Sequence, residues 1–218
     1  KSQEKIMTEF KYSIDSDGVA IISWDVPNKT MNVMSLEGLK ELDKHFDAAL
    51  SDDRVKGIIV TSGKRDFAGG MDVNVLADMK TAQGENPAQG LFIGIMQIHK
   101  LLRKIELAGM DPKTKKGAKP VAAAINGTAA GIGLELPLAC HRIFAIDNEK
   151  SKIGLPEILV GIFPGAGGTT RLVRKLGAMN AAPFLLEGKM LSPAKMKLAG
   201  VIDELTKESD LLSRAKAW

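Results

Sequence analysis

The sequence predicts a single α/β domain, and three observations support that fold class. Short apolar segments rich in Val, Ile and Ala alternate along the chain with longer segments whose apolar residues recur at helical spacing. Glycine-rich turns separate several of these pairs. The chain has 218 residues, 44% hydrophobic and 26% charged, which is enough to bury one sizeable core and is typical of an ordinary globular protein.

The first half is predicted to form a hairpin, two helices and a buried strand. The turn Asp15-Ser16-Asp17-Gly18 separates two segments of alternating polarity, which is a hairpin pattern. Ser35 is the expected N-cap of a helix whose leucines and Phe46 share one face. A glycine-rich loop at residues 63–70 follows the buried strand. The expected strands are 10–14, 19–24 and 57–61, and the expected helices are 35–50 and 89–107.

The second half repeats this alternation. A strand, a glycine turn, a helix and another strand are expected in that order, followed by three further helices. The predicted segments are strands at 121–125 and 142–146 and helices from about 132 and at 168–176, 178–186 and 193–199.

Charge and composition exclude several classes of function. The net charge of +4 and pI near 9.1 suit an anionic small molecule but fall short of the basic surface of a nucleic-acid-binding protein. The most basic stretch, 113–119, reads first as a solvated loop, with a phosphate contact as the alternative. A single cysteine, Cys140, forms no metal-ligand spacing with the three histidines. No apolar run reaches a membrane span and no signal peptide is visible, so we expect a cytoplasmic protein.

Two glutamates lie in unusually apolar surroundings. Glu135 falls within Gly133-Leu134-Glu135-Leu136-Pro137, and Glu157 follows Pro156 in Leu155-Pro156-Glu157-Ile158-Leu159. A carboxylate among leucines usually pairs, shifts its pKa or takes part in proton chemistry, so the two suggest an acid/base pair. The structural alternatives are a helix-start acid at Glu157 and a hydrogen-bonded core or interface carboxylate at Glu135.

Two glycine clusters precede helices and would expose backbone N–H groups at their N-termini. The first, 127–133, leads directly into Glu135. The second, 164–171, partly imitates a dinucleotide-binding fingerprint, with Glu187 about twenty residues on. The imitation fails because Thr170 occupies the third glycine position and too little chain follows to build a nucleotide-binding sheet.

These motifs together resemble the crotonase (enoyl-CoA hydratase/isomerase) superfamily. The resemblance is carried by Lys119-Pro120-Val121 through Glu135, by Gly154-Leu155-Pro156-Glu157 through Leu172, and by the loop Asp66-Phe67-Ala68-Gly69-Gly70-Met71-Asp72. It extends from the first hairpin to about Asp203, and it implies a spiral of β-β-α units. Details such as Trp24-Asp25-Val26-Pro27 look most like the hydratase portion of a fused enoyl-CoA hydratase/3-hydroxyacyl-CoA dehydrogenase.

The resemblance assigns a role to each site residue. Glu135 would activate water and Glu157 would deliver a proton to C2 of an enoyl thioester, while the N–H groups of Met71 and Ile132 would form an oxyanion hole. Family members usually carry small residues at the last two positions, so Met71 and Ile132 are departures that affect the acyl pocket. The coenzyme A moiety would be held, largely through backbone contacts, near Lys29, Thr30, Gly69 and Asp72.

The expected function is hydration of trans-2-enoyl-CoA in fatty-acid β-oxidation. The alternatives are a Δ3,Δ2-enoyl-CoA isomerase and a catalytically weak CoA-binding module. Because stand-alone members continue beyond the position of Trp218 into helices that cover the site and build a trimer, we expect residues 1–218 to be a C-terminally truncated fragment. NAD would belong only to a missing dehydrogenase part. We expect no metal, no other cofactor and no nucleic-acid partner. A homo-oligomer is compatible with the sequence.

Overall fold

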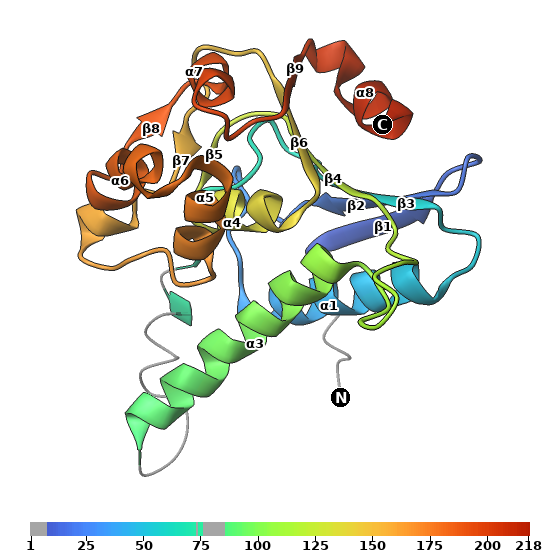
Figure 1. Cartoon of the computed structure of the whole chain (residues 1–218), viewed down its shortest axis with the longest axis horizontal. Helices are drawn as coiled ribbons and strands as arrows, with labels where there is room; N and C mark the ends of the chain where they lie inside the picture. The colour runs from blue at the N-terminus through green and yellow to red at the C-terminus, as the bar shows by residue number, and fades with distance from the viewer. Residues whose placement is uncertain (1–7, 73, 76–85) are drawn as a thin grey trace.

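The computed structural model describes residues 8–72, 74–75 and 86–218. Its main sheet has six strands in the order β1-β2-β3-β4-β6-β9, in which β1 runs antiparallel to β2 and every other neighbour is parallel (Figure 1). The strands are β1 Phe10–Ile14, β2 Val19–Trp24, β3 Gly57–Ser62, β4 Val121–Ile125, β6 Arg142–Ile146 and β9 Glu204–Thr206. Parallel neighbours need crossover connections, and the helices supply them.

Helices and a small second sheet complete the architecture (Figure 1). The second sheet has the order β5-β7-β8, and its strands are two residues each: Ala129–Ala130, Ile153–Gly154 and Met190–Leu191. The helices are α1 Leu36–Ser51, α3 Pro87–Leu107, α4 Ile132–Ala139, α5 Gly168–Leu176, α6 Ala178–Leu186, α7 Pro193–Leu198 and α8 Leu211–Ala217. Two 3₁₀ helices, η1 Glu157–Val160 and η2 Glu208–Asp210, precede α5 and α8.

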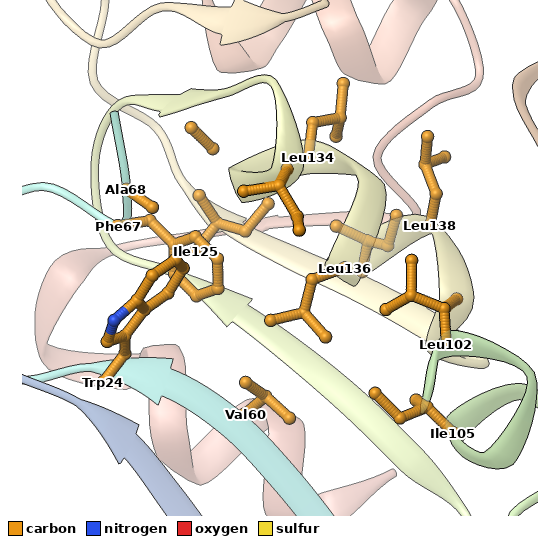
Figure 2. Close-up of a cluster of buried hydrophobic side chains, with 14 of the residues drawn as sticks. Trp24, Val60, Phe67, Ala68, Leu102, Ile105, Ile125, Leu134, Leu136 and Leu138 are labelled. Carbon is orange, nitrogen blue, oxygen red and sulfur yellow. The ribbon is translucent and has the colours of Figure 1, made fainter. Parts of the chain in front are cut away.

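The hydrophobic core lies on both faces of the main sheet. The larger cluster joins the sheet to α1, α3 and α4, and Figure 2 shows Val60 and Ile125 of the sheet in one cluster with Leu134 and Leu136 of α4. The smaller cluster, on the opposite face, joins Ile59 to Leu211 of α8. Ile59 and Val60 point to different clusters because successive strand residues alternate between faces. A sheet covered on both faces is expected of parallel strands.

The predicted elements are confirmed with small shifts in their ends. Ser35 caps α1 by accepting a hydrogen bond from Gly38 N at 2.8 Å. The helix α3 begins two residues earlier than expected, because Asn86 accepts hydrogen bonds from the N–H groups of Ala88 and Gln89 and so caps it. The strands β5, β7, β8 and β9 and the helix α8 were not predicted. Strands of two or three residues are too short to show a period in the sequence.

None of the helices in the described ranges combines the length and apolarity that a membrane crossing requires. The basic stretch 113–119 forms an exposed loop, as predicted, although Lys119 donates from Nζ to the carbonyl oxygens of Ala49 and Asp52. This lysine therefore ties the loop to the end of α1.

Candidate active site

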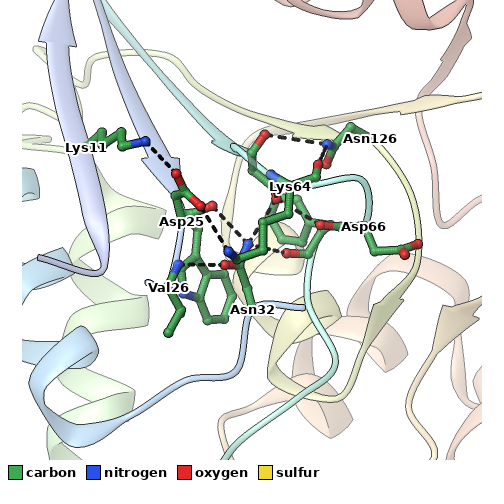
Figure 3. Close-up of polar contacts among 10 residues, drawn as sticks. Lys11, Asp25, Val26, Asn32, Lys64, Asp66 and Asn126 are labelled. Carbon is green, nitrogen blue, oxygen red and sulfur yellow. Dashed lines mark hydrogen bonds and ion pairs between the residues drawn. The ribbon is translucent and has the colours of Figure 1, made fainter. Parts of the chain in front are cut away.

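A buried polar network holds the loop that follows β3 (Figure 3). Asn32 is fully buried, and its Nδ2 lies within hydrogen-bonding distance of the oxygens of Trp24, Ser62 and Phe67, at 2.9 to 3.0 Å. Asn32 Oδ1 accepts from Val26 N at 2.9 Å. Because a buried amide with its polar groups satisfied has one favourable orientation, Asn32 fixes the loop against β2.

Asp66 joins this loop to the first glycine cluster. Its Oδ1 accepts a hydrogen bond from Thr128 N at 2.8 Å, and Thr128 O accepts from the N–H groups of Phe67 and Ala68. Asn126 donates from Nδ2 to Lys64 O, a contact drawn in Figure 3. Two segments about sixty residues apart in the sequence are thus held side by side.

Glycines allow these two segments to approach closely. A Cβ at Gly133 would lie 2.9 Å from both Cβ and O of Ala68, so a larger residue would push the loop away from α4. A Cβ at Gly131 would lie 3.6 Å from Gly70 Cα and 3.2 Å from Glu157 Oε1. Gly131, at a φ of +57°, is therefore the point where the loop, the start of α4 and η1 meet.

The two expected oxyanion-hole donors flank this meeting point. Met34 N donates to Gly70 O and Asp72 N donates to Met34 O, which places Met71 in a bridge beside Met34. Ile132 is the first residue of α4. Within the described residues, neither the Met71 N–H nor the Ile132 N–H donates to a protein acceptor. The Ile132 side chain is 3% exposed, so this residue, larger than the family's usual one, packs within the hydrophobic core.

Glu135 is buried and held by one short hydrogen bond. It lies on the first turn of α4 with 3% of its surface exposed, and its Oε1 accepts from Gly168 N at 2.8 Å. Burial, and to a smaller extent the charge of Glu157, raise the pKa of Glu135 to about 7, although hydrogen bonding from Gly168 and Ala166 and the charge of Arg171 oppose the rise. The expectation of a shifted carboxyl group is confirmed.

Glu157 is the first residue of η1 and is half-buried. Burial raises its pKa above the ordinary value of 4.5. Its Oε1 lies against Gly131, and its Oε2 has no hydrogen-bond partner among the described residues. The helix-start interpretation of Glu157 is also correct, because the residue opens a 3₁₀ helix after Pro156.

The residues expected to hold coenzyme A lie near one another on the surface. Lys29 Nζ and Asp72 Oδ2 form an ion pair at 2.8 Å, and the hydrogen bond from Lys29 is the main reason that the pKa of Asp72 falls below its ordinary value. Gly69 N donates to Asn32 O, and Lys29, Thr30 and Gly69 are all exposed. The ion pair joins the two segments to which the resemblance assigns CoA contacts.

The sequence did not single out Gly168 or Arg171 as partners of Glu135. Both were noted only as part of the second glycine cluster, which resembles a dinucleotide loop but opens α5 instead. The signal available was the resemblance itself, because its motif contains both residues. Cys140 is partly buried, and the burial of its thiol raises the pKa to about 12, so the thiolate is not formed near neutral pH.

Among the described residues, no group of three His, Cys, Asp or Glu side chains is arranged to hold a metal ion. The polar groups of this region are instead the Glu157 carboxylate beside Gly131, the Glu135 carboxylate beside Gly168, and the backbone N–H groups of Met71 and Ile132. Together with the two sheets, this arrangement defines an α/β protein of crotonase fold. The chain belongs to the enoyl-CoA hydratase/isomerase family, whose model matches residues 15–218.

Relatives and solved structures support this placement. The chain is 34% identical over 207 residues to the fatty acid oxidation complex subunit alpha of Shewanella amazonensis, and 35% identical to that of Shewanella halifaxensis. Each match covers 94% of this chain but only 27% of the relative. The enoyl-CoA hydratase structure from Bacillus anthracis superposes with a TM-score of 0.79 at 26% identity, covering 96% of this chain and 74% of that one. The predicted crotonase-like fold is thereby confirmed.

Proposed function

We propose that the chain is an enoyl-CoA hydratase that adds water across the 2,3 double bond of a trans-2-enoyl-CoA. The observation that carries the proposal is the pair of glutamates with raised pKa values, Glu135 and Glu157, beside two N–H groups with no described acceptor. Hydration needs one ionised and one protonated carboxyl group, and raised pKa values favour proton transfer by these glutamates nearer to neutral pH than ordinary glutamates allow.

In the proposed mechanism the two glutamates act on opposite ends of one water addition. Glu135, as the carboxylate, removes a proton from water while the water oxygen bonds to C3. The electron pair of the double bond moves toward the thioester oxygen, where the Met71 and Ile132 N–H groups stabilise the enolate. Glu157, as the acid, then delivers its proton to C2. Water is thereby divided between C2 and C3, and proton exchange with solvent resets the two carboxyl groups.

Crotonyl-CoA provides the direct test. Hydration destroys the conjugation of the enoyl thioester, so its ultraviolet absorbance falls as product forms. Loss of this absorbance that depends on the chain is the expected result. An absorbance that stays constant while coenzyme A still binds would favour the CoA-binding module.

A Δ3,Δ2-enoyl-CoA isomerase is the second candidate, and one observation favours it. Glu157 Oε2 has no described partner and is therefore available to move a proton by itself. An isomerase needs only this carboxyl group, whereas a hydratase needs both. A 3-enoyl-CoA substrate separates the two functions: its conversion in Glu135→Gln at the unaltered rate would support the isomerase.

The substrate would be an acyl-CoA whose nucleotide end lies near the Lys29–Asp72 ion pair. The relatives of which this chain spans 27% are named as subunits of a fatty acid oxidation complex. We therefore propose that a longer parent protein also acts in fatty-acid oxidation, with an NAD-dependent 3-hydroxyacyl-CoA dehydrogenase in its remaining length. The dehydrogenase would oxidise the product that the hydratase forms.

A further inference from the structure

Arg171 lies behind Glu135 and is nine-tenths buried. Its side chain on α5 is 9% exposed. From Nη1 it donates to Ala166 O at 3.2 Å, and its backbone N–H donates to Gly167 O at 3.0 Å. The guanidinium of Arg171 therefore holds Ala166, two residues before Gly168, whose N–H binds Glu135, while the bond to Gly167 O belongs to the backbone of α5.

Glu106 on α3 anchors the guanidinium. Arg171 Nη2 donates to Glu106 Oε2 at 3.4 Å, and Arg103 Nη1 donates to the same oxygen at 2.7 Å. Burial opposes ionisation of Glu106, but its hydrogen bond with Arg103 and the charge of Arg171 hold its pKa below the ordinary value. A buried arginine needs an ionised partner, and Glu106 supplies it.

The same glutamate reaches the end of α4. His141 Nε2 lies 3.1 Å from Glu106 O, two residues beyond the last residue of α4. Glu106 thus contacts both His141, which follows α4, and the guanidinium of Arg171, which holds Ala166. The turn, through Arg171, and the segment after α4, through His141, are thus both tied to Glu106.

We propose that Arg171, anchored by Glu106, is a positioning residue for Glu135: it fixes the turn at residues 166–168 so that the Gly168 N–H stays directed at the carboxylate. This inference rests on the hydratase function proposed above. A hydrogen bond to the charged form of an acid favours that form. Loss of Arg171 would therefore leave a base that is less ionised and less well oriented.

The direction of the pH effect follows from the groups that face Glu135. Glu157 on η1 raises its pKa, while Gly168 and Ala166 from the turn and the Arg171 cation lower it. Cys140 at the end of α4 stays neutral, and Glu106 and Arg103 act on Arg171 from α3. Removing Arg171 removes a cation and loosens a hydrogen bond, and both changes move the pKa of Glu135 upward.

The first test compares Arg171→Met and Arg171→Lys with the matched control Arg174→Met. Arg174 lies on the same helix and lines the same cleft of about 810 Å³ between α3 and α5, but it is exposed and no hydrogen bond from its side chain to a described residue is seen. We expect Arg171→Met to lower kcat for crotonyl-CoA by about ten- to a hundredfold, the scale of a misplaced catalytic group. KM should stay within about threefold, because the CoA contacts are untouched. The rising limb of the pH profile should move to higher pH.

Chemical rescue separates positioning from general stability. The cleft is lined by Gly167, Glu106 and Arg171, so guanidinium added to Arg171→Ala has a path to the vacated position. We expect millimolar guanidinium to restore part of kcat in Arg171→Ala and to leave Arg174→Ala unchanged. Arg171→Lys, which retains the charge and most of the volume, should recover part of the activity and remains informative if the shorter variants do not fold.

Titration of Glu135 by ¹³C NMR of its carboxyl carbon needs no turnover. A higher pKa in Arg171→Met than in the unaltered chain, with Arg171→Lys between the two, supports the proposal even if hydratase activity is absent, a result that would reject only the proposed function. The proposal is overturned by an unchanged Glu135 titration. It is equally overturned by a kcat loss that neither shifts the pH profile nor responds to guanidinium, because that pattern marks a purely structural ion pair.

Discussion

The segments that carry the two glutamates are built in opposite ways. Every residue of α4 is buried, and Glu135 lies on it between the core and the N-terminus of α5. None of the four residues of η1 is buried, and Leu159 and Val160 are 68% and 75% exposed. One acid is thus fixed by the packing of the whole domain, whereas the other projects inward from a surface segment.

The same residue type therefore reaches a raised pKa by two routes. Glu135 combines deep burial with repulsion from Glu157 and keeps one strong hydrogen bond. Glu157 has burial as the main cause of its shift, and one oxygen has no described partner. A held carboxylate suits a base that must orient water. A carboxyl group with a free oxygen suits an acid that must reach the substrate.

Replacing each glutamate is expected to have the largest effect. Glu135→Gln and Glu157→Gln should each lower kcat for crotonyl-CoA by about 10²-fold or more, the usual scale for losing a positioned acid or base. KM should move far less, because neither side chain belongs to the expected CoA contacts. Steady-state hydration assays give both constants.

The double variant sharpens this prediction. Groups that act on one water as a unit are not additive, so Glu135→Gln/Glu157→Gln should be only slightly slower than the slower single variant. Near-normal kcat in either single variant would contradict the assignment of that residue. Fully multiplicative losses would indicate that the two glutamates act in separate steps.

A substitution at Gly168 tests whether the contact with the start of α5 holds Glu135 in place. A Cβ there would lie 2.8 Å from Glu135 Cγ and 2.9 Å from its Oε1, so Gly168→Ala must displace the carboxylate. We expect kcat to fall by about ten- to a hundredfold and the free energy of unfolding by about 1–3 kcal/mol. Gly165→Ala is the control, since its Cβ would meet nothing closer than Phe163 O at 3.8 Å. Equal kcat in the two variants would show that Glu135 does not depend on this turn.

The burial difference also predicts how stability depends on pH. Because the folded pKa of Glu135 is raised from 4.5 to about 7, folding favours its neutral form, and ionisation destabilises the fold increasingly as pH rises through that window. The full cost is roughly 3 kcal/mol at most. Glu135→Gln should therefore raise the unfolding free energy by about that amount at pH 8, and by about 1 kcal/mol or less at pH 5.

Urea unfolding at the two pH values checks this prediction. Glu157→Gln should give a smaller difference between pH 8 and pH 5, because Glu157 is only half-buried. A Glu135→Gln effect of equal size at both pH values would mean that packing, and not ionisation, is what the substitution changes.

The smallest effects are expected at the surface ion pair. Lys29→Ala removes the partner of Asp72 at an exposed position, so stability should change by less than about 1 kcal/mol. If Lys29 contacts the CoA nucleotide, the Kd for coenzyme A should rise about two- to fivefold and the change should shrink in high salt. Calorimetry measures this, with Lys40→Ala on α1 as the exposed control. Identical affinity in the two variants would remove Lys29 from the binding site.

Helices and strands whose apolar residues recur at a regular spacing could be predicted from the sequence. The hairpin, α1, α3 and the strands β3, β4 and β6 were predicted because their apolar residues repeat at strand or helix spacing. The buried acids were also visible, since Glu135 and Glu157 stand out among leucines. Their assigned roles came from the resemblance and remain proposals.

Contacts between segments far apart in the sequence could not be predicted from local sequence patterns. Nothing near Asn32 in the sequence indicates that it is fully buried and satisfies groups on β2, β3 and the glycine loop. Arg171 likewise reads as an ordinary basic residue of an amphipathic helix, although α3 buries it against Glu106. Such residues acquire their role only when distant segments pack together.

The most direct test of the account is the pH dependence of kcat/KM for crotonyl-CoA between pH 5 and 9, which reports ionisations of the free enzyme. We predict that kcat/KM rises with pH through a midpoint near 7, as Glu135 becomes the carboxylate. This rise should be missing in Glu135→Gln. A flat profile in the unaltered chain, or the same rising limb in Glu135→Gln, would contradict the central claim that Glu135 is the base.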